Sequence, residues 1–158
     1  MSLKVKAAAV AVAGLYVYSA GHGHLPGLSA FYGTGTSHFA AVRYAEAQIG
    51  KPYAWGGTGP WSFDCSGLAM EAEKAAGFSI PRTSQAQWAA LPHISRSQLR
   101  PGDLVFYAGS DGSVQSPGHV VIYIGKGKVI QAYAPGYPVE VSSLAAMGAG
   151  ALTGYARP

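Results

Sequence analysis

The chain has 158 residues, which is enough for one compact domain and an extension. Of these residues 49% are hydrophobic, 11% are charged, and 22 are Gly and 10 Pro, a composition typical of a loop-rich globular protein and not of a disordered or fibrous one. The formal net charge is +4, from 11 basic and 7 acidic residues, but Lys and Arg form no run or stripe, which argues against nucleic-acid binding.

The first 20 residues resemble an export signal. Lys4 and Lys6 precede an uncharged apolar run from Ala7 to Ala20, which is shorter than the roughly 20 residues that a membrane span needs. Such a run indicates the hydrophobic region of a signal peptide. A cut after Ala20 would put the bulky Tyr18 at the −3 position, so an uncleaved membrane anchor is an alternative, and a buried helix is a third. We expect a protein that is secreted or held at the outer face of the cytoplasmic membrane.

Residues 21–36 are rich in Gly and Ser and lack charge, which predicts a linker. His22 and His24 are spaced like a metal-binding pair, but no carboxylate lies near them in the sequence. We interpret them as linker residues and place the folded domain at 37–158.

The first helix is predicted to begin near Ser37, with Thr36 or Ser37 as its cap, and to end before Gly50. Phe39, Val42 and Ile49 would share its buried face.

A second helix is expected from about Cys65 to Ala76, with Gly77 as the residue that ends it. Its side chains are mostly small, which would let it pack closely against a sheet. A shorter helix, SQAQWAAL, can start after Thr83.

After these helices, the pattern of hydrophobic residues changes to one typical of β-strands. RPGDLVFYA, GHVVIYIG, KVIQAYA and PVEVS are short β-branched and aromatic runs divided by Gly and Pro. Helices followed by strands predict an α+β domain whose N-terminal helices pack on an antiparallel sheet.

Cys65 is the only cysteine. In an exported protein it cannot form an internal disulfide, so it is either an intermolecular partner or a reactive thiol. At a helix start, with Asp64 or Ser62 as cap, free backbone N–H groups and the helix dipole would favour the thiolate. The same N–H groups could stabilise an oxyanion. The alternative is a buried, inert cysteine.

A reactive thiol needs a base. Among the five histidines, His119 is the best placed, because it begins the strand HVVIYI directly after Pro117-Gly118. The other four lie in or beside the linker or in a polar segment: His22, His24, His38 and His93.

FDCSGL, followed by GDLVFY, GHVVIYIG and KVIQAYAPG and preceded by PYAWGG, resembles the NlpC/P60 family of cysteine peptidases over about Phe39 to Arg157. The resemblance implies a papain-like fold, with Cys65 as nucleophile and His119 as base. It also implies peptidoglycan stem peptides as substrate, typically at the bond between D-γ-glutamate and a diamino acid. It implies no metal or organic cofactor, and we expect a monomer.

The family's third catalytic position falls on Gln131, whose amide oxygen could orient the His119 ring. The two residues share a sheet face if the hairpin loop has three residues, so we predict a loop of Gly125 to Gly127 with Gly127 left-handed. If Gln131 were out of reach, Glu140 and Asp103 would be the replacements.

Further positions carry over from the family. Tyr53 would help the oxyanion hole or bind substrate, Asp64 and Ser66 would contact a free amine, and Arg82 would meet a substrate carboxylate. Each has a structural alternative. Tyr53 could be a core aromatic residue and Asp64 a helix cap. Ser66 could simply lie in the first turn of the helix, and Arg82 could form a surface ion pair.

Three tryptophans, Trp55, Trp61 and Trp88, could wall the cleft or pack in the interior.

The leading hypothesis is therefore an exported cell-wall endopeptidase. Two alternatives remain: a CHAP-like amidase or toxin-type cysteine hydrolase with the same Cys-His pair, and a catalytically silent wall-binding module.

Overall fold

The computed structural model describes residues 36–148 and 151–158. The predicted export signal and residues 21–35 of the predicted linker lie outside these residues, so the domain division remains a prediction; Thr36, the last residue assigned to the linker, is the first residue of the first helix. None of the helices within the described residues has the length and hydropathy needed to cross a bilayer.

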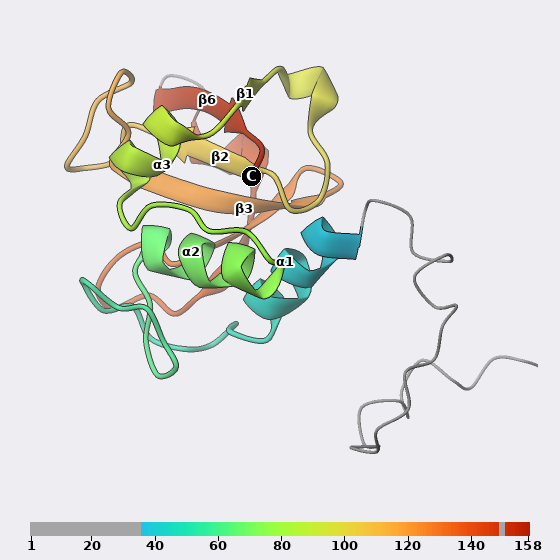
Figure 1. The fold of residues 1–158 in the computed structure, drawn as a ribbon. Helices are drawn as coiled ribbons and strands as arrows, with labels where there is room; N and C mark the ends of the chain where they lie inside the picture. Colours follow the sequence, from blue (N-terminus) through green and yellow to red (C-terminus); the bar gives the residue numbers. More distant parts are fainter. Residues whose placement is uncertain (1–35, 149–150) are drawn as a thin grey trace, which may run out of the picture. The chain divides into compact units, whose positions relative to one another are not determined.

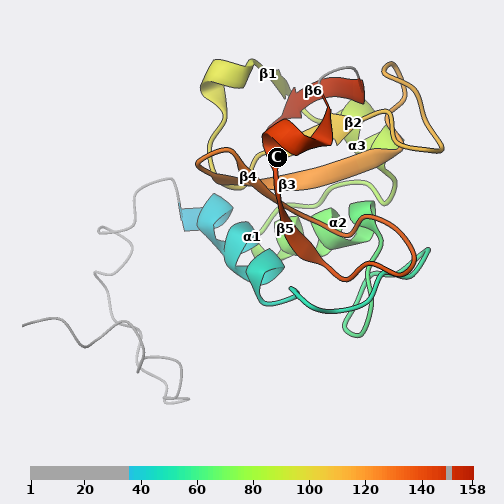
Figure 2. The ribbon, with the colours of Figure 1, turned by 180° about the vertical axis from the view of Figure 1, so that it is seen from behind.

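The described residues form three α-helices followed by a six-stranded antiparallel sheet (Figure 1). Two short 3-10 helices, η2 (Arg96–Gln98) and η3 (Leu144–Met147), interrupt the strands. The sheet order is β1-β6-β2-β3-β4-β5, and Figure 2 shows it from behind with β4 and β5 at one edge. The elements are α1 (Thr36–Glu46), α2 (Cys65–Ala75), α3 (Ser84–Ala90), β1 (His93–Ile94), β2 (Leu104–Tyr107), β3 (His119–Gly125), β4 (Lys128–Gln131), β5 (Glu140–Ser143) and β6 (Leu152–Ala156). The predicted α+β class is confirmed.

The sheet has an apolar cluster on each face, because side chains alternate along the strands. In β2, Leu104 and Phe106 pack with small residues of α1 and α2, including Ala45 and Ala72. Val105 and its neighbours on the other face form a second cluster with η3 and β6. The helices α1 and α2 lie side by side, and the small side chains on them let the cysteine-bearing helix approach the sheet closely.

The buried face of α1 differs from the prediction. Val42 is buried as expected, but Phe39 is 64% exposed and Ile49, which lies beyond the end of the helix, is 46% exposed. Ala41 and Ala45 are fully buried instead. Alanine at the contact brings α1 close to α2, which large side chains there would prevent.

The two helices after α1 follow the prediction. Helix α2 begins at Cys65, and Gly77, at φ 91°, follows its C-cap, which is the left-handed position that favours glycine. Helix α3 begins after Thr83, whose side chain accepts a hydrogen bond from Ala86 N–H.

Strands β1 and β6 were not predicted. β6 inserts between β1 and β2, and its Gly154 lies against the ring of Trp88, where a Cβ atom would come within 2.7 Å of the indole. The tryptophan therefore packs against the sheet.

The β3–β4 loop has two residues, so the prediction of a three-residue loop is wrong. The turn consists of Lys126 and Gly127, at φ 51° and 69°, the positive values of a type I′ turn. The left-handed Gly127 is confirmed.

A bulge compensates for the shorter turn. The register shifts between Tyr123 and Gly125, beyond which Ile122 pairs with Ile130. One extra residue on β3 restores the side-chain phase that a two-residue turn alone would reverse. Gln131 therefore lies on the same sheet face as His119, as expected.

Candidate active site

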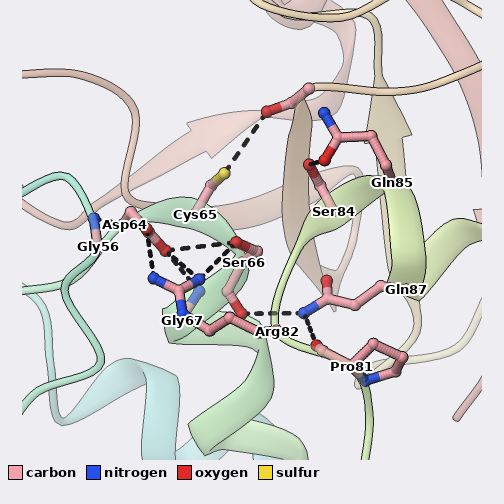
Figure 3. A network of polar contacts seen from close by, with 11 residues as sticks. Gly56, Asp64, Cys65, Ser66, Gly67, Pro81, Arg82, Ser84, Gln85 and Gln87 are labelled. Atoms are coloured by element: carbon pink, nitrogen blue, oxygen red, sulfur yellow. Dashed lines mark hydrogen bonds and ion pairs between the residues drawn. The ribbon is translucent and has the colours of Figure 1, made fainter.

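Asp64 caps the helix that carries the cysteine. Its Oδ1 accepts a hydrogen bond of 2.7 Å from Gly67 N–H at the start of α2, and Figure 3 shows this end of the helix. The first intrahelical bond runs from Leu68 N–H to the Asp64 carbonyl, so the Cys65 N–H belongs to the helix end that lacks an intrahelical acceptor. Of the two predicted caps, Asp64 is confirmed and Ser62 is not used.

Two sequence motifs meet at this helix end. A Cβ atom at Gly67 would overlap the carbonyl oxygen of Gly57, and Asp64 N–H donates to that same oxygen at 3.0 Å. The Gly-Gly pair of PYAWGG therefore packs directly on the Asp-Cys-Ser-Gly turn. This contact fixes the position of Cys65 relative to the preceding loop.

The Cys65 thiol is half-buried and unpaired. It donates a 3.8 Å hydrogen bond to the carbonyl of Gly118, the residue directly before His119 (Figure 3). Among the contacts of the described residues, the thiol has no hydrogen bond with the imidazole itself. The cysteine and the strand that bears the histidine are thus in contact through the backbone.

Burial raises the pKa of the Cys65 thiol, although N–H groups of Val120 and Ser66 act to lower it. The negative charges of Asp64 and Asp111 add to the increase. We expected the helix start to favour the thiolate, but removal of the sulfur from water outweighs the nearby N–H groups. The free structure therefore favours the thiol.

His119 is buried at the start of β3 and is held by Gln131. Its Nε2 lies 3.1 Å from Gln131 Oε1, and because an amide oxygen only accepts, Nε2 carries the hydrogen and Nδ1 is the basic nitrogen. Burial lowers the pKa of His119, and the hydrogen bond with Gln131 partly opposes this. The ring is therefore neutral at neutral pH.

The amide of Gln131 is itself fixed. Its Nε2 donates to Ser142 Oγ at 2.9 Å and to Glu140 Oε1 at 3.3 Å, both on β5. Glu140 thus acts on the amide, not on the ring. Asp103, the other replacement considered, is fully buried and pairs with Arg157 at 2.7 Å.

Arg82 binds the Asp64 carboxylate with both terminal nitrogens, at 3.0 Å and 2.6 Å, and donates to Ser66 Oγ at 2.8 Å (Figure 3). The same carboxylate accepts the N–H groups of Gly56 and Gly67. Asp64 and Ser66, expected to hold a substrate amine, are therefore occupied by protein donors. Arg82, expected to meet a substrate carboxylate, has its charge balanced by Asp64.

These residues surround one cleft of about 810 Å³. Cys65, His119, Tyr53, Asp64, Ser66 and Arg82 all line it, so the structure brings together the predicted residues, with Gln131 behind His119. Burial, followed by the charges of Cys65, Asp64 and Asp111, raises the pKa of Tyr53, which keeps its hydroxyl protonated and able to donate.

The three tryptophans have different surroundings. Trp55 lines the cleft and is 79% exposed. Trp61 is 82% exposed and is not among the lining residues. Trp88 stacks on His93 with ring centroids 3.6 Å apart, so it packs and does not wall the cleft.

Asp111, also in the cleft wall, was missed by the sequence interpretation. It lies in the loop DGSVQSPG, whose only signal was its position just before His119. Among the described residues, no group of His, Cys, Asp and Glu side chains has the arrangement of a metal site.

The sequence model of the NlpC/P60 family matches residues 50–153. The chain is 46% identical over 93 residues to the probable endopeptidase p60 of Listeria innocua, covering 59% of this chain and 19% of that protein. It is 43% identical over 122 residues to a probable endopeptidase of Mycobacterium tuberculosis, covering 75% of this chain and 30% of that protein. The chain thus spans less than a third of the length of either relative.

The fold is similar to the crystal structure of the NlpC/p60 domain of the peptidoglycan hydrolase SagA. The TM-score is 0.65 at 34% sequence identity, and the match covers 77% of this chain and 98% of that domain.

Proposed function

Because this chain belongs to the NlpC/P60 endopeptidase family, we propose that it is a cysteine peptidase that hydrolyses an amide bond in peptidoglycan stem peptides. We propose in addition that it is exported, on the ground of the two lysines and the uncharged apolar run in its first 20 residues. The observation that carries the catalytic part is the His119 Nε2–Gln131 Oε1 contact of 3.1 Å. It leaves the basic Nδ1 nitrogen on a histidine that lines the same cleft as Cys65.

The resting pair consists of a neutral thiol and a neutral imidazole, since burial acts on both groups in that direction. Nδ1 of His119 takes the thiol proton as the sulfur attacks the carbonyl carbon of the substrate. The hydrogen bond to Gly118 must be exchanged in this step, and catalytic contacts that are loose without substrate commonly tighten once it binds.

The attack places negative charge on the carbonyl oxygen. The Cys65 N–H, at the helix end without an intrahelical acceptor, and the protonated Tyr53 hydroxyl are the donors available to it. Preorganised donors of this kind contribute about 3–4 kcal/mol each to transition-state stabilisation.

Collapse of the intermediate breaks the C–N bond, and the imidazolium of His119 gives its proton to the leaving amine. The acyl group then remains on the Cys65 sulfur as a thioester. Water attacks the thioester carbon with Nδ1 as base, which releases a carboxylic acid and restores the thiol. The family resemblance favours the bond between D-γ-glutamate and the diamino acid.

The test is digestion of purified peptidoglycan, with products analysed by mass spectrometry. Wild type should release peptides with a new N-terminal diamino acid, and Cys65→Ala should release none while keeping its circular dichroism and melting temperature. A free lactyl carboxylate on the sugar would instead identify an amidase. Identical products from Cys65→Ala would reject the thiol mechanism.

A further inference from the structure

Asp111 is an exposed carboxylate in the wall of the cleft. It lies in the loop between β2 and β3, and its Oδ1 rests against Gly118, where a Cβ atom would overlap it. Gly118 carries the carbonyl that accepts the Cys65 thiol. The carboxylate is therefore placed beside the peptide that links the thiol to the histidine strand.

The loop holds this position through tight backbone contacts. Gly118 N–H donates to the Ala108 carbonyl at 2.8 Å, and a Cβ atom at Gly112 would overlap Gly118 N. Ser113 and Ser116 exchange backbone hydrogen bonds of 2.9 Å and 3.1 Å across the loop. These contacts make the loop compact, and they hold Asp111 in place.

Three charged side chains line the cleft: Asp64, Arg82 and Asp111. The first two neutralise each other through a two-pronged ion pair. Asp111 forms no ion pair with any described residue. The cleft therefore offers one uncompensated negative charge. Its field reaches the reacting groups, since it adds to the increase that burial causes in the pKa of Cys65 and partly opposes the decrease that burial causes in the pKa of His119.

The chemistry of cleavage decides which half of the substrate meets this charge. His119 must protonate the leaving nitrogen, so the leaving residue lies on the histidine side of the thiol. The loop that carries Asp111 leads directly into His119, whereas Asp64 and Arg82 lie on the side of α2 and α3.

We propose that Asp111 is a specificity-determining residue that binds the side-chain ammonium group of the leaving diamino acid. This inference rests on the proposed function and assigns a charge preference to it. A carboxylate accepts hydrogen bonds from an ammonium group, and the opposite charges of the two groups strengthen these bonds. A residue with a neutral side chain of the same length would forfeit that contact.

The experiment compares two synthetic peptides, L-Ala-γ-D-Glu-L-Lys and L-Ala-γ-D-Glu-L-norleucine, which differ by the side-chain amine. Wild type should cleave the lysine peptide with a kcat/KM about fivefold higher, the order expected for a solvent-accessible ion pair. The difference should appear mainly in KM and should shrink at high salt. Asp111→Asn should abolish the preference, whereas Asp111→Glu should retain part of it.

Gln115→Ala in the same exposed loop is the matched control and should leave both rates unchanged. Equal rates of wild type on both peptides, or an equal loss on both in Asp111→Asn, would overturn the inference and leave the peptidase intact. An Asp111 effect that disappears when the peptide N-terminus is acetylated would assign the carboxylate to that amine instead, and would also overturn it. Failure of wild type to cleave either peptide would reject the proposed function as well.

Discussion

The imidazole of His119 is oriented by an uncharged partner, Gln131, at 3.1 Å from Nε2 to the amide oxygen. A carboxylate at this position would stabilise an imidazolium before substrate arrives. The amide fixes the ring without supplying that charge, and burial then keeps both His119 and Cys65 in their neutral forms. The ion pair therefore has to form during the reaction.

The pH dependence of wild-type activity follows from the directions of the pKa shifts of His119 and Cys65. Activity needs a neutral His119 and a protonated Cys65 in the resting pair, and burial lowers the pKa of the first from 6.5 and raises that of the second from 9.0. The acid limb of kcat/KM should thus have its midpoint below pH 6.5 and the alkaline limb above pH 9. Stopped assays on a synthetic stem peptide would measure both, and an acid midpoint above 6.5 would contradict the neutral pair.

Gln131→Glu should move the acid limb to higher pH, because a carboxylate beside Nε2 raises the pKa of His119. Gln131→Leu removes the acceptor and should lower kcat/KM by roughly 10- to 100-fold. Ser142→Ala is the milder control, since it removes one of the two acceptors that hold the amide. Unchanged rate and pH profile in Gln131→Leu would show that the ring is held by other contacts.

Much of this arrangement could be predicted from the sequence because its signals are local. The caps at Asp64 and Thr83 and the left-handed Gly77 and Gly127 depend on residues a few positions apart. The strands β2 to β5 were visible as short β-branched runs.

The contacts that were missed are tertiary. A bulge between Tyr123 and Gly125 allows a shorter turn without changing which face of the sheet Gln131 occupies. Nothing in the hairpin sequence distinguishes a three-residue loop without a bulge from a two-residue turn with one. The engagement of Asp64 by Arg82 joins residues 18 positions apart, so a spacing rule could not reveal that the carboxylate was occupied. The same holds for the buried face of α1, which the packing of α2 decides.

Because Glu73 is buried, we expect the stability of the folded protein to depend on pH. It is fully buried on α2, neither carboxyl oxygen has a hydrogen-bond partner, and burial, with the charge of Asp103, raises its pKa from 4.5 to about 8. Between these values the unfolded chain is ionised and the folded one is not, so stability falls by about 1.4 kcal/mol per pH unit. Glu73→Gln removes this loss and should raise the melting temperature more at pH 8 than at pH 5.

Thermal denaturation at the two pH values measures that difference. Glu71→Gln, which removes the ion pair with Lys74, is the control on the same helix and should change the melting temperature little at either pH. A stabilisation by Glu73→Gln that is the same at both pH values would show that the carboxyl is ionised or hydrated in the folded protein.

Substitutions at Arg82 test whether its guanidinium supports the fold through the ion pair with Asp64 or binds the substrate. Arg82→Leu leaves a largely buried carboxylate with only the N–H groups of Gly56 and Gly67 and a 3.4 Å hydrogen bond from the Ser66 hydroxyl. Because the guanidinium is partly exposed, we expect a loss of about 1–2 kcal/mol in the free energy of unfolding, less than for a fully buried pair. The cap of the cysteine helix would loosen, so kcat should fall together with stability.

Urea denaturation and steady-state kinetics on one preparation separate the two roles. Arg82→Lys keeps the charge but loses the two-pronged contact, so a structural Arg82 predicts partial recovery of stability and of kcat. If Arg82→Leu instead unfolds like wild type and raises only KM, the guanidinium binds the substrate carboxylate. Asp64 would then be held firmly enough by the N–H groups of Gly56 and Gly67 and the hydroxyl of Ser66.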